Sequence, residues 1–299
     1  RHLGYQVTFF RFNVDPRPPV RASGLATNQV WMAHVAMTDT AGEQVQQRQR
    51  LSRGAAGLAG ARAAPFAVWL DDWQLIAESP AGTFPARLDV RLDPGYALEL
   101  RLEAVKPRVL QGDRGYSQKG RGAGNASRYF SWTRLQTRGR VQLEGEWLSV
   151  QGSGWLDREW GTSTLTTDQV GWDWFSLQLD NGRDLMVYQL RLADGGVDPR
   201  SKGLLVGSDG GSRVLRGDEF SIRVRRWWRS PAGDARYPVA WTLTLPGEAL
   251  TLDVESRVDD QEWRSGFRYW EGAVSARGTQ AGAGVSGVGY VEMTGYASP

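Results

Sequence analysis

The sequence contains no cysteine, which excludes disulfide bonds, thiolate catalysis and zinc–sulfur sites. Histidine is nearly absent too, because His34 is the only one of the two His residues that lies inside the chain. With one usable imidazole and no thiol, a transition-metal site is improbable. A Ser–His–Asp triad has little support either, since no Gly-x-Ser-x-Gly element occurs. We therefore predict neither a metal nor another cofactor.

Long apolar runs are also missing, so no segment approaches the length of a membrane-spanning helix. No signal peptide heads the chain. The sequence starts at Arg1, without Met and within an apolar strand pattern. We therefore expect a processed or truncated product that has lost any targeting signal.

Charge is nearly balanced, because 36 basic residues, most of them Arg, face 33 acidic ones for a net charge of +3. The one tight basic–aromatic cluster is Arg225–Arg229 (RRWWR). Such clusters can bind single-stranded nucleic acid. Arg stacking on Trp within a sheet is the simpler interpretation. Since no other basic stripe supports the first reading, we expect no nucleic-acid partner.

Gly (37 residues) and Trp (14 residues) are abundant, a composition typical of strands joined by turns. Apolar and alternating runs predict strands in the first half at 3–14, 29–38, 66–70, 73–78, 87–93, 96–105, 128–137, 139–143 and 146–154. In the second half they predict strands at 172–179, 184–191, 203–206, 212–215, 220–228, 239–245, 249–258, 267–275 and 287–295. This regular spacing indicates a barrel or a sandwich.

One segment has helical character. Ala41–Ala64 is rich in Gln, Arg and Ala, although its three Gly residues weaken the pattern, and we expect a short helix there. A long Gly-rich loop over 111–127 is a candidate lid or rim.

The polar run Thr162–Gln169 predicts a linker, and Asn181-Gly182 predicts a tight hairpin turn. The Arg-led aromatic strands Arg1–Arg11 and Arg183–Arg191 resemble one another and suggest two similar tandem domains. The predicted domains are residues 1–161 and 162–299.

Five segments together resemble the AttH-like family, whose members are often labelled secreted hydrolases and are related to carotenoid 1,2-hydratases. The most specific are Trp155–Gly161 (WLDREWG) and Gly289–Tyr296 (GYVEMTGY); the others are 4–11, 33–39 and 52–60. The resemblance spans nearly the whole chain. It implies an all-β protein with two tandem lipocalin-like (calycin) antiparallel β-barrel domains, a periplasmic or secreted location and a role with lipids or isoprenoids. Related fungal proteins act as hydratases or pericyclases on apolar polyenes.

The sequence departs from that family at one place. Members carry a Glu-Trp-Trp-Tyr strand just before the strand that matches Leu3–Arg11. Its counterpart in the second half is Trp172–Phe175. The first barrel is therefore expected to lack one wall or to borrow it.

In an extended Trp155–Trp160 segment, Trp155, Asp157 and Glu159 share one face, with the two carboxylates roughly 6–7 Å apart. Burial and mutual repulsion would raise the pKa of one carboxyl. A protonated acid facing an alkene could donate to the C=C bond, and nearby Trp faces would stabilise the resulting cation. The favoured alternative is structural, with both carboxylates paired to Arg158, Arg11 or Arg191.

His34 is a candidate proton shuttle, against the more common role of a hydrogen-bonded core residue. Asp173 could join the site or simply end a strand. Trp174 could instead close the bottom of a barrel against Arg268 or Arg277.

Three functions stay open: binding of an apolar lipid or isoprenoid, a hydratase or isomerase that protonates a polyene, and a structural or transport-accessory role with filled barrels. Peripheral membrane association or a transporter partner is compatible with the first. The candidate catalytic residues are Asp157, Glu159 and His34. The candidate ligand-binding residues are Trp155, Trp160, Trp172, Asp173, Trp174, Tyr188, Arg11 and Trp31.

Overall fold

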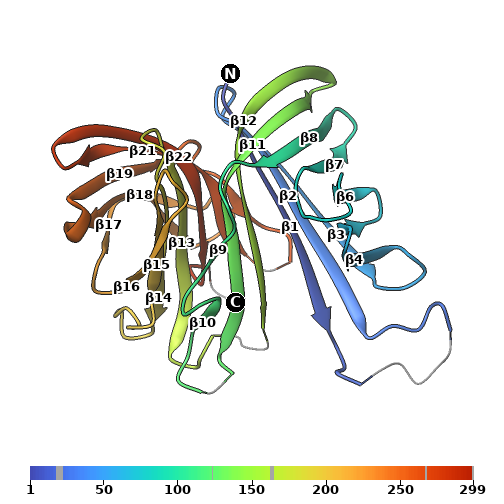
Figure 1. Cartoon of the computed structure of the whole chain (residues 1–299), viewed down its shortest axis with the longest axis horizontal. Coiled ribbons are helices and arrows are strands. Elements are labelled where there is room, and N and C mark those ends of the chain that lie inside the picture. The colour runs from blue at the N-terminus through green and yellow to red at the C-terminus, as the bar shows by residue number, and fades with distance from the viewer. Residues whose placement is uncertain (18–22, 123, 162–164, 267, 298–299) are drawn as a thin grey trace.

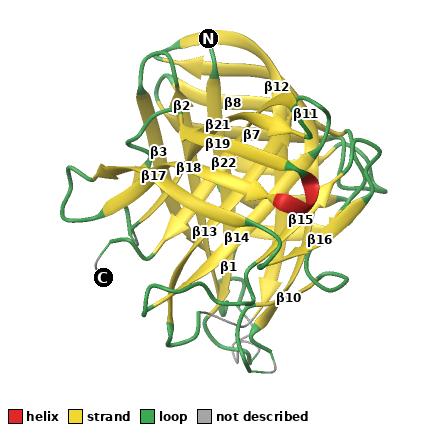
Figure 2. Cartoon of the chain, turned by 90° about the vertical axis from the view of Figure 1, so that its left-hand side faces the viewer, coloured by secondary structure: helices red, strands yellow, loops and turns green. Residues whose placement is uncertain are grey.

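The computed structural model describes residues 1–17, 23–122, 124–161, 165–266 and 268–297. Two curled antiparallel half-barrels lie side by side, with β11, β12 and β13 between them (Figure 1). Figure 2 shows that nearly all regular structure is strand, and the single helical element of the described residues is a 3-10 turn at Pro246–Glu248. The predicted all-β, lipocalin-like architecture is confirmed.

The described residues form three sheets. The first has the order β1-β2-β3, with β1 Leu3–Asn13, β2 Gln29–Asp39 and β3 Gln44–Arg53. The nine-stranded sheet contains β4 Ala59–Ala63, β5 Phe66–Leu70, β6 Trp73–Ala77, β7 Ala86–Asp93, β8 Tyr96–Ala104, β9 Val109–Leu110, β10 Tyr116–Gln118, β11 Ala126–Leu143 and β12 Glu146–Gly161. The ten-stranded sheet contains β13 Gln169–Leu179, β14 Asp184–Leu192, β15 Lys202–Val206, β16 Ser212–Arg216, β17 Ser221–Arg229, β18 Arg236–Leu245, β19 Leu250–Ser256, β20 Glu262–Trp263, β21 Tyr269–Gln280 and β22 Ala283–Thr294.

The helix predicted over Ala41–Ala64 is wrong. Residues 44–53 form β3, which pairs with β2 along its whole length, and residues 59–63 form β4. The Gln, Arg and Ala side chains favour helix locally, but pairing with β2 satisfies the backbone groups on one edge of β3 along its whole length, and this tertiary pairing overrides propensity. The predicted loop over 111–127 also contains the short strand β10.

The Asn181-Gly182 hairpin is confirmed: β13 and β14 pair directly up to Gln178 and Asp184, and Gly182 has a positive φ of 82°. The predicted linker Thr162–Gln169 lies partly outside the described residues, at 162–164. Of its described residues, Gln169 already belongs to β13.

Each half-barrel has its own apolar core. Trp31, Val35 and Trp73 belong to the core of the first half, and Phe175, Trp241 and Trp270 belong to that of the second. Alternation within β2 assigns Trp31, Ala33, Val35 and Met37 to the first core, while His34 and Ala36 face Trp263 and Tyr269 of the second half. The prediction that β2 is buried on both faces is confirmed.

A third apolar cluster joins the halves: Val109 and Tyr129 of the first half pack with Met186, Tyr188, Leu190, Leu204 and Val206 of the second, and Trp155, Trp172 and Trp174 lie against them. Among the described residues, β1 and β12 both end their sheets, because β1 pairs only with β2 and β12 only with β11. In the second half β13 pairs on both sides, with β14 and β22. The polar residues between these facing sheets form the candidate site.

Candidate active site

The first wall of the site is the face of β11 and β12 that points to the second half. The register places Ser131 opposite Asp157 and Tyr129 opposite Glu159. Trp155 lies in the cluster between the halves, whereas Leu156 packs into the first core and Arg158 lies over the ring of Phe66, at 4.9 Å. The predicted division of Trp155–Trp160 into two opposite faces is therefore confirmed.

The second wall is a row of side chains that crosses four strands of the ten-stranded sheet. Register aligns Tyr188 on β14, Trp174 on β13, Glu292 on β22 and Glu271 on β21. Trp174 Nε1 donates to Tyr129 Oη at 3.2 Å, which brings the two walls together. Trp172 Nε1 donates to Glu292 Oε1 at 2.8 Å. Each wall thus contributes aromatic rings and acids to one space.

Asp157 is the acid of the first wall. It accepts hydrogen bonds from Ser131 Oγ and from Trp155 Nε1, the latter at 2.9 Å, and a further one from Tyr129. Burial raises the pKa of Asp157 to about 6, because desolvation outweighs these three donors, and the nearby charge of Glu159 adds to the rise. Within the described residues Asp157 takes part in no ion pair, so the predicted pairing with Arg158, Arg11 or Arg191 does not form.

Glu292 and Glu271 are the acids of the second wall. Burial, with a contribution from Glu159 and Asp157, raises the pKa of Glu292 to about 7 even though Trp172 donates to it. The pKa of Glu271 lies well above its ordinary range, first because of burial and then because of the charges of Glu292 and Asp157. Carboxyl groups this close cannot all ionise, so the cluster retains protons near neutral pH.

Glu159 differs from the other three acids, because it is paired with Lys119 at 2.5 Å and receives a hydrogen bond from Ser127 Oγ. Its side chain is 38% exposed. Burial alone would lower the pKa of Lys119. Glu159 and other nearby acidic groups outweigh this effect and keep the pKa of Lys119 above its ordinary value. Lys119 comes from the loop predicted as a rim and lies 5.2 Å from the ring centroid of Tyr188.

His34 lies on the same side of β2 as this space. Its Nδ1 is 2.7 Å from Tyr269 Oη and its Nε2 is 2.9 Å from Gln49 Oε1. The ring stacks on Trp263 at 4.3 Å. Burial lowers the pKa of His34, so the imidazole is neutral at neutral pH.

The site brings together five of the predicted ligand-binding and catalytic residues of the central segment: Asp157, Trp155, Trp172, Trp174 and Tyr188. Trp155, Asp157, Trp172, Trp174 and Glu292 keep part of their surface exposed, so the two walls are not closed against each other. Trp174 faces Tyr129, and Arg268 binds Glu262 instead, so the predicted barrel-closing pair with Arg268 does not form.

Four predicted residues lie elsewhere. Asp173 points to the opposite face of β13, where Arg191 Nε is 3.2 Å from Oδ1 and Gln189 Nε2 donates to Oδ2 at 2.7 Å. Trp160 is on the outer face of β12 and is 54% exposed. Arg11 lies over Trp31, 6.0 Å from its centroid, and Trp31 belongs to the first core.

The sequence analysis does not predict a role for Glu271, Glu292, Tyr269 or Lys119. Glu292 and Tyr290 lie within the Gly289–Tyr296 motif, one of the segments that carry the family resemblance. On a strand, residues two apart share a face, so that motif already placed an acid on the side away from the core residues Val291 and Met293. Glu271 becomes visible only through its pairing with Glu292.

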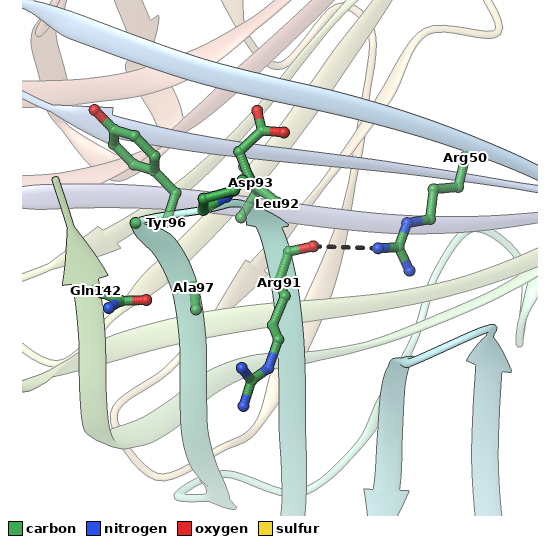
Figure 3. A pocket seen from close by; sticks show the side chains of 9 residues that line it. Arg50, Arg91, Leu92, Asp93, Tyr96, Ala97 and Gln142 are labelled. Atoms are coloured by element: carbon green, nitrogen blue, oxygen red, sulfur yellow. Dashed lines mark hydrogen bonds between the residues drawn. The ribbon is translucent and has the colours of Figure 1, made fainter. Parts of the chain in front are cut away.

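A pocket of about 250 Å³ lies apart from this site, at the turn between β7 and β8 (Figure 3). None of the predicted site residues lines it; its residues are Arg50, Arg91, Leu92, Asp93, Pro94, Gly95, Tyr96, Ala97 and Gln142. Arg50 is held over the ring of Trp73 at 4.2 Å and donates to the carbonyl of Arg91. These contacts give Arg50 a packing role there.

Among the described residues, no three His, Cys, Asp or Glu side chains are arranged to hold a metal ion. No helix in the part of the chain that the structure describes could cross a membrane.

The fold and the facing rows of acids and Trp define a lipocalin-like, two-half-barrel protein with a shared polar–aromatic site. The chain belongs to the AttH-like family, whose model matches residues 1–296. An AttH-type crystal structure from Nitrosomonas europaea is 36% identical, with a TM-score of 0.83 over 99% of this chain and 88% of that one.

Kievitone hydratase of Fusarium solani subsp. phaseoli is 28% identical over 152 residues, which are 46% of this chain and 39% of that protein. The chain thus matches well under half of the length of this relative. The crystal structure of kievitone hydratase from Nectria haematococca, at 18% identity, has a TM-score of 0.71 over 90% of this chain and 80% of that one, which shows a shared fold.

The raised pKa of Asp157 gives a prediction for stability. Its ordinary pKa is 3.8, so the folded protein binds the proton more tightly than the unfolded chain. Stability should fall as the pH rises from about 4 to about 6, and the cost of the buried charge should be complete above that window. Asp157→Asn removes this cost. We expect the variant to be more stable than the wild type at pH 8 by about 2 kcal/mol, and no more stable at pH 4, in urea unfolding. An equal difference at both pH values would contradict the assignment.

Proposed function

We propose that the protein is a hydratase-type enzyme that adds water across a C=C bond of an apolar, isoprenoid-like substrate. The observation that carries the proposal is the convergence of Asp157, Glu292 and Glu271 with Trp155, Trp172 and Trp174 between the two half-barrels. Membership of a family with a hydratase relative supports the same reaction class.

The two carboxyl groups have different roles in the proposed reaction. Glu292, with a pKa of about 7, stays protonated to a higher pH than Asp157, with a pKa of about 6. Groups whose environments separate their pKa values in this way suit the roles of acid and base. Glu292 would donate a proton to one alkene carbon, and Asp157 would accept a proton from the water that attacks the other carbon.

The aromatic rings supply the other requirement. Protonation of an alkene generates a carbocation, and the negative face of an indole ring stabilises a cation. Trp155 and Trp174 meet edge to face with centroids 6.4 Å apart, so they present differently oriented rings to one space. Their N–H groups are committed to Asp157 and Tyr129, which fixes the ring positions.

Solvent labelling tests the reaction. A prenylated phenol with a trisubstituted alkene, incubated with the protein in D₂O, should gain one deuterium at the less substituted carbon and one hydroxyl at the other. In H₂¹⁸O the new hydroxyl should carry the label. Failure to label any of a panel of such alkenes, together with failure to catalyse the reverse loss of water from the matching tertiary alcohols, would reject the proposal.

Binding of an apolar ligand without chemistry is the second candidate. The partly exposed Trp155, Trp172 and Trp174 favour it, because ligand sites are commonly lined by aromatic side chains with few polar groups. Native mass spectrometry and lipid extraction distinguish it: a co-purifying isoprenoid recovered unchanged supports binding alone. The absence of any bound or titratable apolar ligand rejects it.

A further inference from the structure

The part of β11 that extends beyond β8 carries a face on which Arg and aromatic side chains alternate. β8 pairs with residues 135–142 of β11, so residues 126–131 are flanked by β9 and β10 on one side and by β12 on the other (Figure 1). Register forms one row across these strands from Tyr116, Arg128 and Trp160. The next row on the same face consists of Leu110, Phe130 and Arg158.

Each guanidinium group of this face lies over an aromatic ring. Arg128 is 5.5 Å from the ring centroid of Tyr116, and Arg158 is 5.6 Å from that of Phe130. Arg108, which precedes β9, lies 4.9 Å from the centroid of the same Phe130 ring. Two cations from distant parts of the sequence therefore meet at one ring.

Within the part of the chain that the structure describes, Arg108, Arg128 and Arg158 have no acidic partner. Burial lowers the pKa of Arg158, and the charge of Arg108 lowers it further, which is the effect of a like charge. The two acids of β12 point to its opposite face, where Asp157 binds Ser131 and Glu159 binds Lys119. The positive charge of this face is therefore available to an anionic partner.

The basic–aromatic cluster that is visible in the sequence, Arg225–Arg229, is different. Arg225 lies 3.0 Å from Asp253, and Arg226 is paired with Asp259. Acids of the same half thus neutralise two of its three cations. The cations at β9, β11 and β12 come together only through strand pairing, and they keep their charge.

Exposed apolar side chains accompany this charge. Trp160 is 54% exposed and Leu110 is 43% exposed. A partner that matches both properties presents phosphate groups above an apolar layer, as the surface of an anionic bilayer does. Single-stranded nucleic acid fits less well, because bases stack on open ring faces, and guanidinium groups already lie over the rings of Tyr116 and Phe130.

We propose that this face of β9–β12 docks the protein on the surface of an anionic lipid bilayer. The three Arg side chains bind the lipid phosphates, and Trp160 and Leu110 enter the interface between water and lipid, where Trp is enriched. The inference goes beyond the proposed hydration and does not depend on it. Because Arg158 and Trp160 alternate along β12 with Asp157 and Glu159, docking places the lipid behind the first wall of the site.

Vesicle co-sedimentation tests the docking. The wild type should sediment with vesicles of phosphatidylcholine and phosphatidylglycerol, and far less with vesicles of phosphatidylcholine alone. Each Arg near an anionic surface contributes about fivefold to partitioning, so Arg108→Gln, Arg128→Gln and Arg158→Gln combined should weaken it by about 100-fold. The corresponding triple Lys variant keeps the charge and should retain most of the binding. Trp160→Gln, at an exposed side chain outside the core, should weaken partitioning by about 10-fold.

The matched control combines Arg225→Gln, Arg226→Gln and Arg229→Gln, which removes the same charge from β17 and should leave vesicle binding unchanged. Equal losses in the two triple Gln variants would overturn the proposal, because net charge alone would then explain the binding. Sedimentation of the wild type that does not depend on the anionic lipid would also overturn it, as would tighter binding to a single-stranded oligonucleotide than to the anionic vesicles. Sedimentation requires no turnover, so a failed labelling experiment would reject the proposed reaction and leave this test intact.

Discussion

Asp157→Asn and Glu292→Gln are each expected to reduce hydration of a prenylated substrate by about 100-fold or more, the usual contribution of a general acid or base. Both changes keep the shape of the side chain and remove only the titratable oxygen. Ser131 and Trp155 can still donate to the remaining carbonyl oxygen of residue 157, and Trp172 to that of residue 292. Loss of activity would therefore report lost proton transfer. Initial rates over pH 5–9, with thermal unfolding of each variant, measure it.

The comparison with Glu159 makes this experiment discriminating. Glu159 is paired with Lys119 and more exposed, so Glu159→Gln should reduce the rate by less than about 10-fold. Asp218→Asn, at an exposed pair with Arg216, should leave it unchanged. A larger loss from Glu159→Gln than from Asp157→Asn would assign the role of the base to Glu159. Full activity of both Asp157→Asn and Glu292→Gln would end the acid–base proposal.

The central segment shows why one wall of the site is predictable from sequence. Alternation along Trp155–Trp160 depends only on strand geometry, so the shared face of Trp155 and Asp157 follows from sequence. The turn at Asn181-Gly182 follows equally, because its conformation is fixed by local sterics.

The second wall depends on pairing between distant strands. Glu271 and Glu292 are adjacent because β21 and β22 pair with a particular register, and they meet Asp157 because two half-barrels pack together. Neither fact is encoded by local periodicity. The incorrect helix at Ala41–Ala64 has the same origin. β2 pairs with one edge of β3 along its whole length, and the local composition of the Gln- and Arg-rich segment does not reveal this partner.

The packing of the two half-barrels depends on one buried acid, and we expect Asp184→Ala to cost about 3–5 kcal/mol of unfolding free energy. The Asp184 side chain is fully buried, with Lys106 Nζ 2.8 Å from Oδ2 and Arg134 Nη2 2.6 Å from Oδ1. Thr133 Oγ1 donates to Oδ2 at 2.8 Å. Lys106, Thr133 and Arg134 belong to the first half and Asp184 to the second. Removing the carboxylate leaves the Lys106 ammonium, only 5% exposed, without its counter-charge.

Urea unfolding of Asp184→Ala, Asp218→Asn and the double variant Asp184→Leu/Lys106→Met measures this contribution. Asp218→Asn, at an ion pair whose side chains are 74% and 72% exposed, should cost under about 0.5 kcal/mol. The double variant should recover part of the loss, because apolar replacement of both ions removes the unpaired charge. A cost for Asp184→Ala no larger than that of the surface control would show that the buried network does not hold the halves together.

The same network should influence the site, because the two lie on the same strands. The pairing of β11 with β12 shifts register between Trp132 and Leu135, which frees Thr133 and Arg134 to reach Asp184. Ser131, two residues earlier on β11, donates to Asp157, and Tyr188, four residues after Asp184 on β14, lies in the second wall. Removing the Asp184 carboxylate should therefore let the two walls of the site move apart, and it is these walls that bring Asp157 near Glu292. In Asp184→Ala we expect the pKa of Asp157 to move back toward its ordinary value as solvent enters, which the pH dependence of its carboxyl infrared band would record.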